Sequence, residues 1–320
     1  MSDLRIVTFT ANPSVDRTAE VAELQRGAVI RAGQTRVDGG GKGVNVTRAL
    51  AANGYPSVAV LPSGGAEGAQ LLALLEAERL EVRPVAIADA VRANVTIVEP
   101  DGTTTKINEP GPTLTDKEIE ALTGELLRVA AGAQWTVLSG SLPPGVPSDL
   151  YATLTGRLHA AGTRVAVDTN GTALRTSLHA HPDLIKPNRK ELSEASGIEV
   201  ETIPDALLAI EIVRNNGART VLASLGSDGA LLVEDGGAYH ATGSVLVPRS
   251  TVGAGDAALA GFLAKGGFGP DALREAVAWG SAAVSLPGSG MPAPADLDRS
   301  AVRINQLEVL EVGSEHADHA

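Results

Sequence analysis

The sequence predicts an α/β fold, with a mostly parallel sheet covered by helices on both faces and a second, smaller sheet beside it. Short β-branched runs alternate with Ala- and Leu-rich helical runs along most of the chain, which is typical of a parallel sheet. Two stretches break this alternation and show only strand-like patterns. With 320 residues, 43% of them apolar, the chain can bury a sizeable core in one large domain plus a smaller element, or in two domains.

The alternation can be followed run by run. Strand-like runs are expected at 58–61, 135–138, 164–168 and 220–225, and helical runs at 67–78 and 148–161. The stretches that break the alternation are residues 5–38 and 91–109.

Composition excludes several classes of function. A net charge of −12 argues against nucleic acid as a partner, and aromatic residues are too scarce, at 2%, to stack single strands. Phosphorylated metabolites remain possible ligands, because a few cationic side chains and helix N-termini can make the electrostatic potential positive locally. The absence of cysteine excludes disulfides, thiolate nucleophiles and Cys-ligated metals, and suits a reducing compartment.

Nothing in the sequence predicts export or a membrane partner. The N-terminal segment lacks a basic stretch followed by an apolar run, and no stretch approaches the ~18 apolar residues of a membrane span. We therefore expect a cytoplasmic protein. The polar residues 313–320 are expected to fray, and the histidines there and at 179 and 181 are interpreted as surface residues.

Residues 91–109 predict a β-hairpin. Apolar and polar residues alternate up to the turn sequence of residues 100–102, Pro-Asp-Gly, which favours a three-residue loop and pairs Glu99 with Thr103. This register places four polar side chains on one face, namely Arg92, Asn94, Lys106 and Asn108. An ordinary solvated face is the alternative, and a two-residue loop would move Lys106 to the other face.

A first glycine-rich motif spans residues 39–46 and begins a helix that ends near Asn53, before Gly54. Lys42 and Asn45 are three residues apart, so they share one face at the positive end of this helix. The motif is not a Walker loop, because GxxxxGK[ST] is absent. A glycine-rich turn with no ligand is the alternative.

A second motif, at residues 251–258, begins another helix. Its GAGDAA matches GxGxxA, but a dinucleotide fingerprint should follow the first strand of a βαβ unit, and here it lies near the end of the chain. Asp256 sits beside consecutive free N–H groups, which suits a general base next to an anion hole. Alternatively, Asp256 only stabilises the first helical turn, by ~0.3–1 kcal/mol.

Between the two motifs, Asn188 and Glu191 have the spacing of an N-cap and an N3 residue, so a capping box is one interpretation. The other is a pair of oxygen ligands for Mg²⁺. The spacing alone does not separate the two.

Taken together and in this order, the glycine-rich motifs resemble the paired signatures of the ribokinase-like PfkB carbohydrate kinases, with residues 188–191 between them. The resemblance covers nearly the whole chain. The segments 10–16, 105–112, 139–145 and 186–188 are similar to the 1-phosphofructokinase and tagatose-6-phosphate kinase branch, and ribokinase and adenosine kinase lack this set.

The resemblance implies a single ribokinase-like kinase domain over residues 1–320, with a β-sheet lid formed by segments at about 11–38 and 91–109. It implies ATP- and Mg²⁺-dependent phosphoryl transfer to a primary hydroxyl of a phosphorylated ketohexose, with fructose 1-phosphate favoured, and a homodimer paired through the lid as a candidate assembly. Tagatose 6-phosphate and fructose 6-phosphate are alternative substrates. A non-catalytic regulator and a Rossmann dehydrogenase are remote alternatives.

The resemblance also assigns roles to individual residues. Sugar hydroxyls would be contacted by Asp16, Gly40, Gly41 and Asn45. The phosphate already on the sugar would lie beside Lys42, Arg92, Asn94, Lys106 and Ser139. Asp256 would be the base and Gly253, Ala254 and Gly255 the anion hole. The nucleotide side would hold Lys186, Asn188, Ser224, Gly226, Gly229 and Thr251, with Asn188 and Glu191 near Mg²⁺.

Two positions depart from the pattern of the family. Ser250 stands where many members carry Asp, which we interpret as a marker of the branch. Ala257 and Ala258 follow the proposed base where the branch often has a hydroxyl or a bulkier residue, which bears on fine substrate preference.

Overall fold

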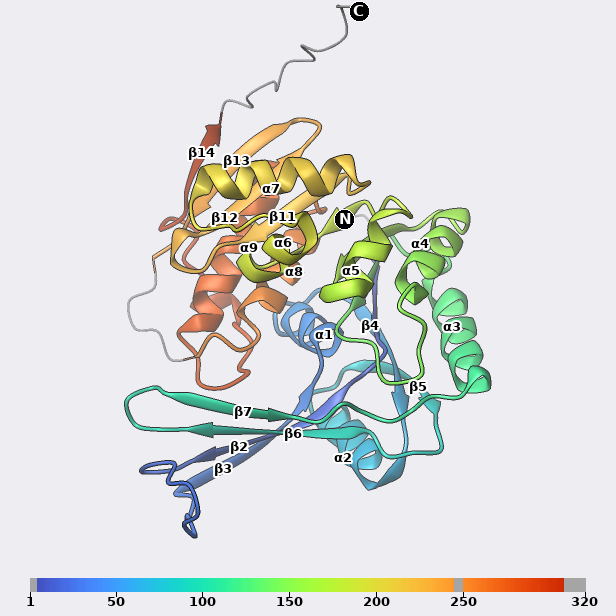
Figure 1. Cartoon of the computed structure of the whole chain (residues 1–320), viewed down its shortest axis with the longest axis vertical. Coiled ribbons are helices and arrows are strands. Elements are labelled where there is room, and N and C mark those ends of the chain that lie inside the picture. Colours follow the sequence, from blue (N-terminus) through green and yellow to red (C-terminus); the bar gives the residue numbers. More distant parts are fainter. Residues whose placement is uncertain (1–4, 245–249, 308–320) are drawn as a thin grey trace, which may run out of the picture.

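Ten strands form the central sheet of the computed structural model, which describes residues 5–244 and 250–307 (Figure 1). Their order across the sheet is β14-β13-β12-β11-β10-β9-β8-β1-β4-β5. The strands are β1 (Ile6–Thr10), β4 (Ser57–Ser63), β5 (Glu81–Ala86), β8 (Trp135–Ser139), β9 (Arg164–Asp168), β10 (Leu184–Ile185), β11 (Thr220–Ser224), β12 (Ala230–Glu234), β13 (Gly237–Thr242) and β14 (Arg303–Leu307). Neighbours from β5 to β11 are parallel, and β12, β13 and β14 extend the sheet antiparallel.

Helices cover both faces of this sheet, which confirms the predicted fold class. One face packs against α1 (Lys42–Ala52), α8 (Ala254–Ala264) and α9 (Gly269–Val284). The other face packs against α3 (Asp116–Ala130), α4 (Leu150–Ala160), α5 (Gly171–Leu178), α6 (Arg189–Ser196) and α7 (Ile203–Asn215). Within the described ranges, no helix is both long and apolar enough to cross a bilayer.

A separate four-stranded sheet accounts for the stretches that broke the alternation. Its order is β3-β2-β6-β7, and it lies at the lower end of the view in Figure 1, away from the C-terminal strands. The strands are β2 (Ser14–Glu20), β3 (Gln34–Gly40), β6 (Arg92–Val98) and β7 (Thr104–Asn108). Helix α2 (Gly65–Ala77) buries Leu71 and Leu75 against Val15 and Val44, which anchors the base of this small sheet to the large domain.

The hairpin has the predicted register. Asn94 pairs with Asn108 and Thr96 with Lys106, and the Glu99 N–H donates to the Thr103 carbonyl over 2.9 Å. The loop turns at Gly102, whose φ of +90° is a conformation that glycine adopts readily. Lys106 therefore lies on the face that carries Asn94, and the two-residue loop is excluded.

The polar residues of interest follow the carboxyl ends of parallel strands. Asn12 follows β1, Ser141 follows β8, Asn170 follows β9 and Lys186 follows β10. In open α/β sheets, ligands bind at this edge. The predicted fraying of residues 313–320 lies outside the described residues.

Candidate active site

Asp256 lies in the first turn of α8 and is only 7% exposed. Its Oδ2 accepts a hydrogen bond from Nδ2 of Asn45 over 2.8 Å, so the two glycine-rich motifs meet at this carboxyl group. Burial, and then the nearby charge of Asp168, raise the pKa of Asp256 to about 6. A carboxylate with this pKa is largely ionised at pH 7 and yet binds a proton more readily than an ordinary Asp, as a general base requires.

A cluster of opposite charges lies next to Asp256. Lys42 Nζ is 2.8 Å from Asp168 Oδ1 and 3.0 Å from Glu191 Oε1, and Lys186 Nζ is 3.3 Å from Asp168 Oδ2. Burial alone would lower the pKa of Lys42, but the surrounding carboxylates raise it above its ordinary value. Burial alone would raise the pKa of Asp168, but Lys186 and Lys42 hold it below its ordinary value. Lys42 therefore stays charged at neutral pH.

Lys186 also reaches the predicted anion hole. A Cβ at Gly255 would lie 3.2 Å from Lys186 Nζ, so the ammonium group sits directly beside the turn of residues 253–255. Gly253 caps the helix in a left-handed conformation, with φ of +79°, and no side chain caps this end. The free N–H groups of the first turn and the ammonium group together favour an anion.

On the side of the small sheet, Asp16 accepts hydrogen bonds from Ser14 Oγ over 2.7 Å and from Asn94 Nδ2 over 2.9 Å. Gly40 lies against this group, because a Cβ there would collide with the Asp16 carboxylate and the Ser14 hydroxyl. The structure thus brings together Asp16, Gly40 and Asn94, whereas the resemblance implied Asp16 and Gly40 at the sugar hydroxyls and Asn94 beside the phosphate.

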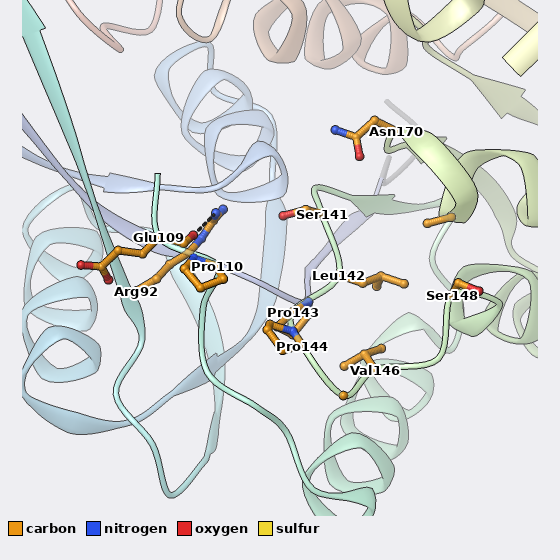
Figure 2. Close-up of a pocket in the computed structure, with 12 residues that line it drawn as sticks. Arg92, Glu109, Pro110, Ser141, Leu142, Pro143, Pro144, Val146, Ser148 and Asn170 are labelled. Atoms are coloured by element: carbon orange, nitrogen blue, oxygen red, sulfur yellow. Dashed lines mark hydrogen bonds between the residues drawn. The ribbon is translucent and has the colours of Figure 1, made fainter. Parts of the chain in front are cut away.

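Beside this group is an open pocket of about 520 Å³ (Figure 2). Arg92 forms one wall, and Ser141 and Asn170 form the opposite side. The Arg92 guanidinium donates to the Glu109 carbonyl over 3.1 Å and to the Asn12 carbonyl over 3.0 Å. A fixed guanidinium and a hydroxyl across an open space suit a phosphate.

Three predicted residues lie elsewhere than expected. Ser139 is fully buried, and its Oγ donates to the Phe9 carbonyl at 3.5 Å, because β8 turns this side chain into the interior. Ser141, two residues later, lines the pocket instead. Lys42 faces carboxylates rather than Arg92. Lys106 is exposed and does not line the pocket, since it opposes Thr96, roughly 13 Å along the strand from Arg92 at ~3.3 Å per residue.

Asn188 and Glu191 form the capping box of α6. The Glu191 N–H donates to Asn188 Oδ1 and the Asn188 N–H donates to Glu191 Oε2, both over 2.9 Å. The capping interpretation is confirmed, while the role near Mg²⁺ stays a prediction. The described ranges hold no group of three or more His, Cys, Asp or Glu side chains arranged for a metal.

Two of the residues expected on the nucleotide side, Asn188 and Ser224, are neighbours. Asn188 forms a parallel bridge with Ser224, and the Ser224 N–H donates to the Pro187 carbonyl over 3.0 Å. The turn that follows uses left-handed φ values at Gly226 and Gly229. Thr251 is exposed and lies two residues before the start of the anion-hole turn.

Sequence reasoning missed Asp168, Asn12 and Ser141. Asp168 is fully buried between two lysines, yet it ends a predicted strand. A charged residue at the carboxyl end of a buried strand was the signal that could have identified it. The other two lie within segments 10–16 and 139–145, which had been singled out only as segments.

Comparison with known proteins identifies the family of the chain. The family model described as pfkB family carbohydrate kinase matches residues 10–296. A 1-phosphofructokinase of Rhodobacter capsulatus is 37% identical over 297 residues, covering 91% of this chain and 94% of that protein. An ATP-dependent 6-phosphofructokinase isozyme 2 of Escherichia coli is 35% identical and covers 89% of this chain and 94% of its own.

Solved structures show the same fold. Phosphofructokinase-2 from Escherichia coli, in complex with substrates and products, matches with a TM-score of 0.86 and 34% identity, covering 91% of this chain and 96% of that one. A ribokinase of Arabidopsis thaliana, complexed with ribose and ATP, matches with a TM-score of 0.72 at 23% identity, over 94% of this chain and 97% of that one.

Proposed function

The chain belongs to the pfkB family of carbohydrate kinases, and from that premise we propose that it phosphorylates fructose 1-phosphate to fructose 1,6-bisphosphate with ATP. The observation that carries the proposal is the pocket that holds Arg92 and Ser141. Asn45 is hydrogen-bonded to Asp256, and Asp16 to Asn94, which lies two residues from Arg92 on β6. We assign the free hydroxyl of the sugar phosphate to the Asp256 end and its phosphate to the pocket.

The positions of the segments typical of the branch favour a ketohexose phosphate, and the relatives named 1-phosphofructokinase favour fructose 1-phosphate among these. Segments 10–16, 105–112 and 139–145 all contribute to the pocket or to its supporting hydrogen bonds, through Asn12, Pro110 and Ser141. The features that set this branch apart from ribokinase are thus gathered around the proposed phosphate.

In the proposed reaction, the acceptor oxygen of the sugar forms a bond to the γ-phosphorus as the bond to the β,γ-bridging oxygen breaks. Asp256 takes the hydroxyl proton, and Asn45 holds the carboxylate in position. Lys186 and the N–H groups of the 253–255 turn neutralise charge on the transferring group. The products are the bisphosphate, ADP and a protonated Asp256 that returns its proton to solvent.

Mg²⁺ fits the donors next to this turn. Asp168 Oδ2 is buried and forms the 3.3 Å ion pair with Lys186 Nζ but no well-aligned hydrogen bond among the described residues, and Glu191 lies in the same cluster through Lys42. Mg²⁺ needs only one or two carboxylates, because it keeps several waters and binds the phosphates of ATP. When bound, the ion would neutralise phosphate charge. We assign Asp168 and Glu191 to holding it, directly or through water, with Asn188 fixing Glu191.

We further propose that the four-stranded sheet is the lid and that two chains pair through it. Val29 and Ile107, both on lid segments, are 89% and 57% exposed, which suits an interface between copies. Light scattering during size-exclusion chromatography tests this proposal. A dimer that Ile107→Asp converts to a monomer supports it, and a wild-type monomer at micromolar concentration contradicts it.

The substrate is tested by measuring phosphoryl transfer from ATP to fructose 1-phosphate, tagatose 6-phosphate and fructose 6-phosphate with the same purified protein. We expect the highest kcat/KM for fructose 1-phosphate. A kcat/KM tenfold higher for tagatose 6-phosphate or fructose 6-phosphate would correct the proposed substrate and leave the proposed kinase activity unchanged. ADP release with no acceptor phosphorylated would contradict the kinase itself.

A further inference from the structure

We propose that Asn12 is the positioning residue of the phosphate pocket, holding the base of the hairpin and the loop after β8 so that Arg92 and Ser141 face one phosphate. The inference rests on the proposed function, because it assumes that the pocket binds the phosphate of the substrate. It concerns a residue that does not line the pocket itself.

Three hydrogen bonds converge on Asn12. Its Nδ2 donates to the Pro110 carbonyl over 3.0 Å and to Ser141 Oγ over 3.4 Å, and its own carbonyl accepts from Arg92 over 3.0 Å. All three partners line the pocket. They lie 98, 129 and 80 residues away in the chain, so their positions relative to Asn12 depend on the tertiary fold.

Asn12 is placed for this task by the fold. It is 2% exposed and lies in the three-residue link between β1 of the central sheet and β2 of the small sheet. Arg92 and Pro110 belong to the small-sheet side of the pocket, whereas Ser141 follows β8 of the central sheet. Asn12 therefore connects the two halves of the pocket at the point where the chain passes from one sheet to the other.

The chemistry of the side chain matters as much as its place. A carboxamide supplies the two N–H donors that the Pro110 carbonyl and Ser141 Oγ accept. An Asp of the same shape supplies no donor when ionised, and its charge would lie next to a backbone carbonyl and near the substrate phosphate. Gly111 packs against this carboxamide with φ of +95°, and a Cβ at Gly111 would collide with it, so the turn at 111 requires glycine.

The first experiment compares the wild type with Asn12→Asp, using whichever of the three sugar phosphates the wild type phosphorylates best. We expect KM for the sugar phosphate to rise about tenfold or more, with kcat and KM for ATP within about twofold. Asn53→Asp is the matched control, because the Asn53 carboxamide also donates two hydrogen bonds, to the carbonyls of Ala49 and Pro292, away from the pocket. Its KM should not change. A pure loss of kcat, an unchanged KM, or an equal effect of Asn53→Asp would overturn the inference.

The second experiment asks whether Asn12 acts through Arg92 and Ser141. The double variant, Asn12→Asp with Arg92→Ala, should have a KM for the sugar phosphate less than twofold above that of Arg92→Ala alone. Both changes weaken the same contact with the phosphate, so their effects are not additive in free energy. If the KM increases of the two single variants multiply in the double variant, a positioning role is contradicted. Should Asn12→Asp fail to fold, Asn12→Ser keeps a hydroxyl that cannot reach both partners and carries the same expectation.

The outcomes separate this inference from the proposed function. A wild type that prefers another sugar phosphate corrects the substrate and leaves the test of Asn12 intact. If Arg92→Ala weakens sugar-phosphate binding and Asn12→Asp does not, the proposed function stands and the role of Asn12 is refuted.

Discussion

Asn45 and Asp256 lie 211 residues apart in the chain and are joined by a 2.8 Å hydrogen bond at the start of two packed helices. Helices α1 and α8 each begin at a glycine-rich motif, so this bond fixes the positions of the two motifs relative to each other. It also holds the buried carboxylate in one orientation.

Replacement of Asp256 by Asn should reduce kcat by about 10²–10⁴, because the acceptor hydroxyl loses its base while its binding groups remain. The variant should remain folded. Burial raises the pKa of Asp256, so its ionised form destabilises the folded state, and the gain in Tm of Asp256→Asn should be larger at pH 8 than at pH 5. Near-normal turnover would leave Asp256 as a residue that only stabilises its helix.

The pH profile of kcat/KM should break near pH 6, with activity falling as the pH is lowered. The pKa of Asp256 is about 6, and below it the carboxyl group is protonated and cannot accept the hydroxyl proton. The hydrogen bond from Asn45 lowers this pKa, so Asn45→Ala should move the break to higher pH. A break near pH 4 in the wild type, or no movement in the variant, would argue against Asp256 as the titrating base.

Arg92→Ala should raise KM for the sugar phosphate about tenfold or more, which corresponds to about 1.4 kcal/mol per decade, and leave KM for ATP nearly unchanged. Lys106→Ala should have a smaller effect, because Lys106 lies outside the pocket in this structure. Initial rates at varied sugar phosphate and varied ATP measure both constants. An equal effect of the two changes would mean that lid closure brings Lys106 onto the phosphate, and a rise in KM for ATP alone would place the hairpin on the nucleotide side.

Gly255→Val should depress kcat, since its side chain would enter the space beside Lys186 Nζ that we assign to the transferring group. Gly156→Ala is a useful control in α4, because a Cβ there meets nothing within 4 Å. It should retain full activity and gain up to about 1 kcal/mol of stability. Melting curves must accompany the kinetics. Full activity of a folded Gly255→Val protein would contradict an anion hole at residues 253–255.

Much of the fold could be predicted because its signals are local. The three-residue loop at residues 100–102 set the hairpin register, and the paired residues Asn94 and Asn108 confirm it. Asp256 could be singled out because a carboxylate in the first turn of a glycine-led helix is a local pattern.

The rest of the site depends on contacts between distant segments. Ser139 and Ser141 belong to the same short segment at the end of a predicted strand, so the sequence does not distinguish them. Only the packing of β8 against β1 decides which of the two faces the pocket. Lys42 was expected at the phosphate, but Asp168 and Glu191 attract its ammonium group from 126 and 149 residues away. No periodicity or spacing reports such a charge cluster.

The central claim is tested most directly by a competition in one tube, with equimolar fructose 1-phosphate and fructose 6-phosphate, limiting ATP and Mg²⁺, followed by ³¹P NMR. The resonances of the two substrates are separate, so their relative rates of loss give the ratio of their kcat/KM values. We predict that fructose 1-phosphate is consumed at least tenfold faster, with one ADP formed for each fructose 1,6-bisphosphate. Faster loss of fructose 6-phosphate, or ADP formed without bisphosphate, would contradict the account.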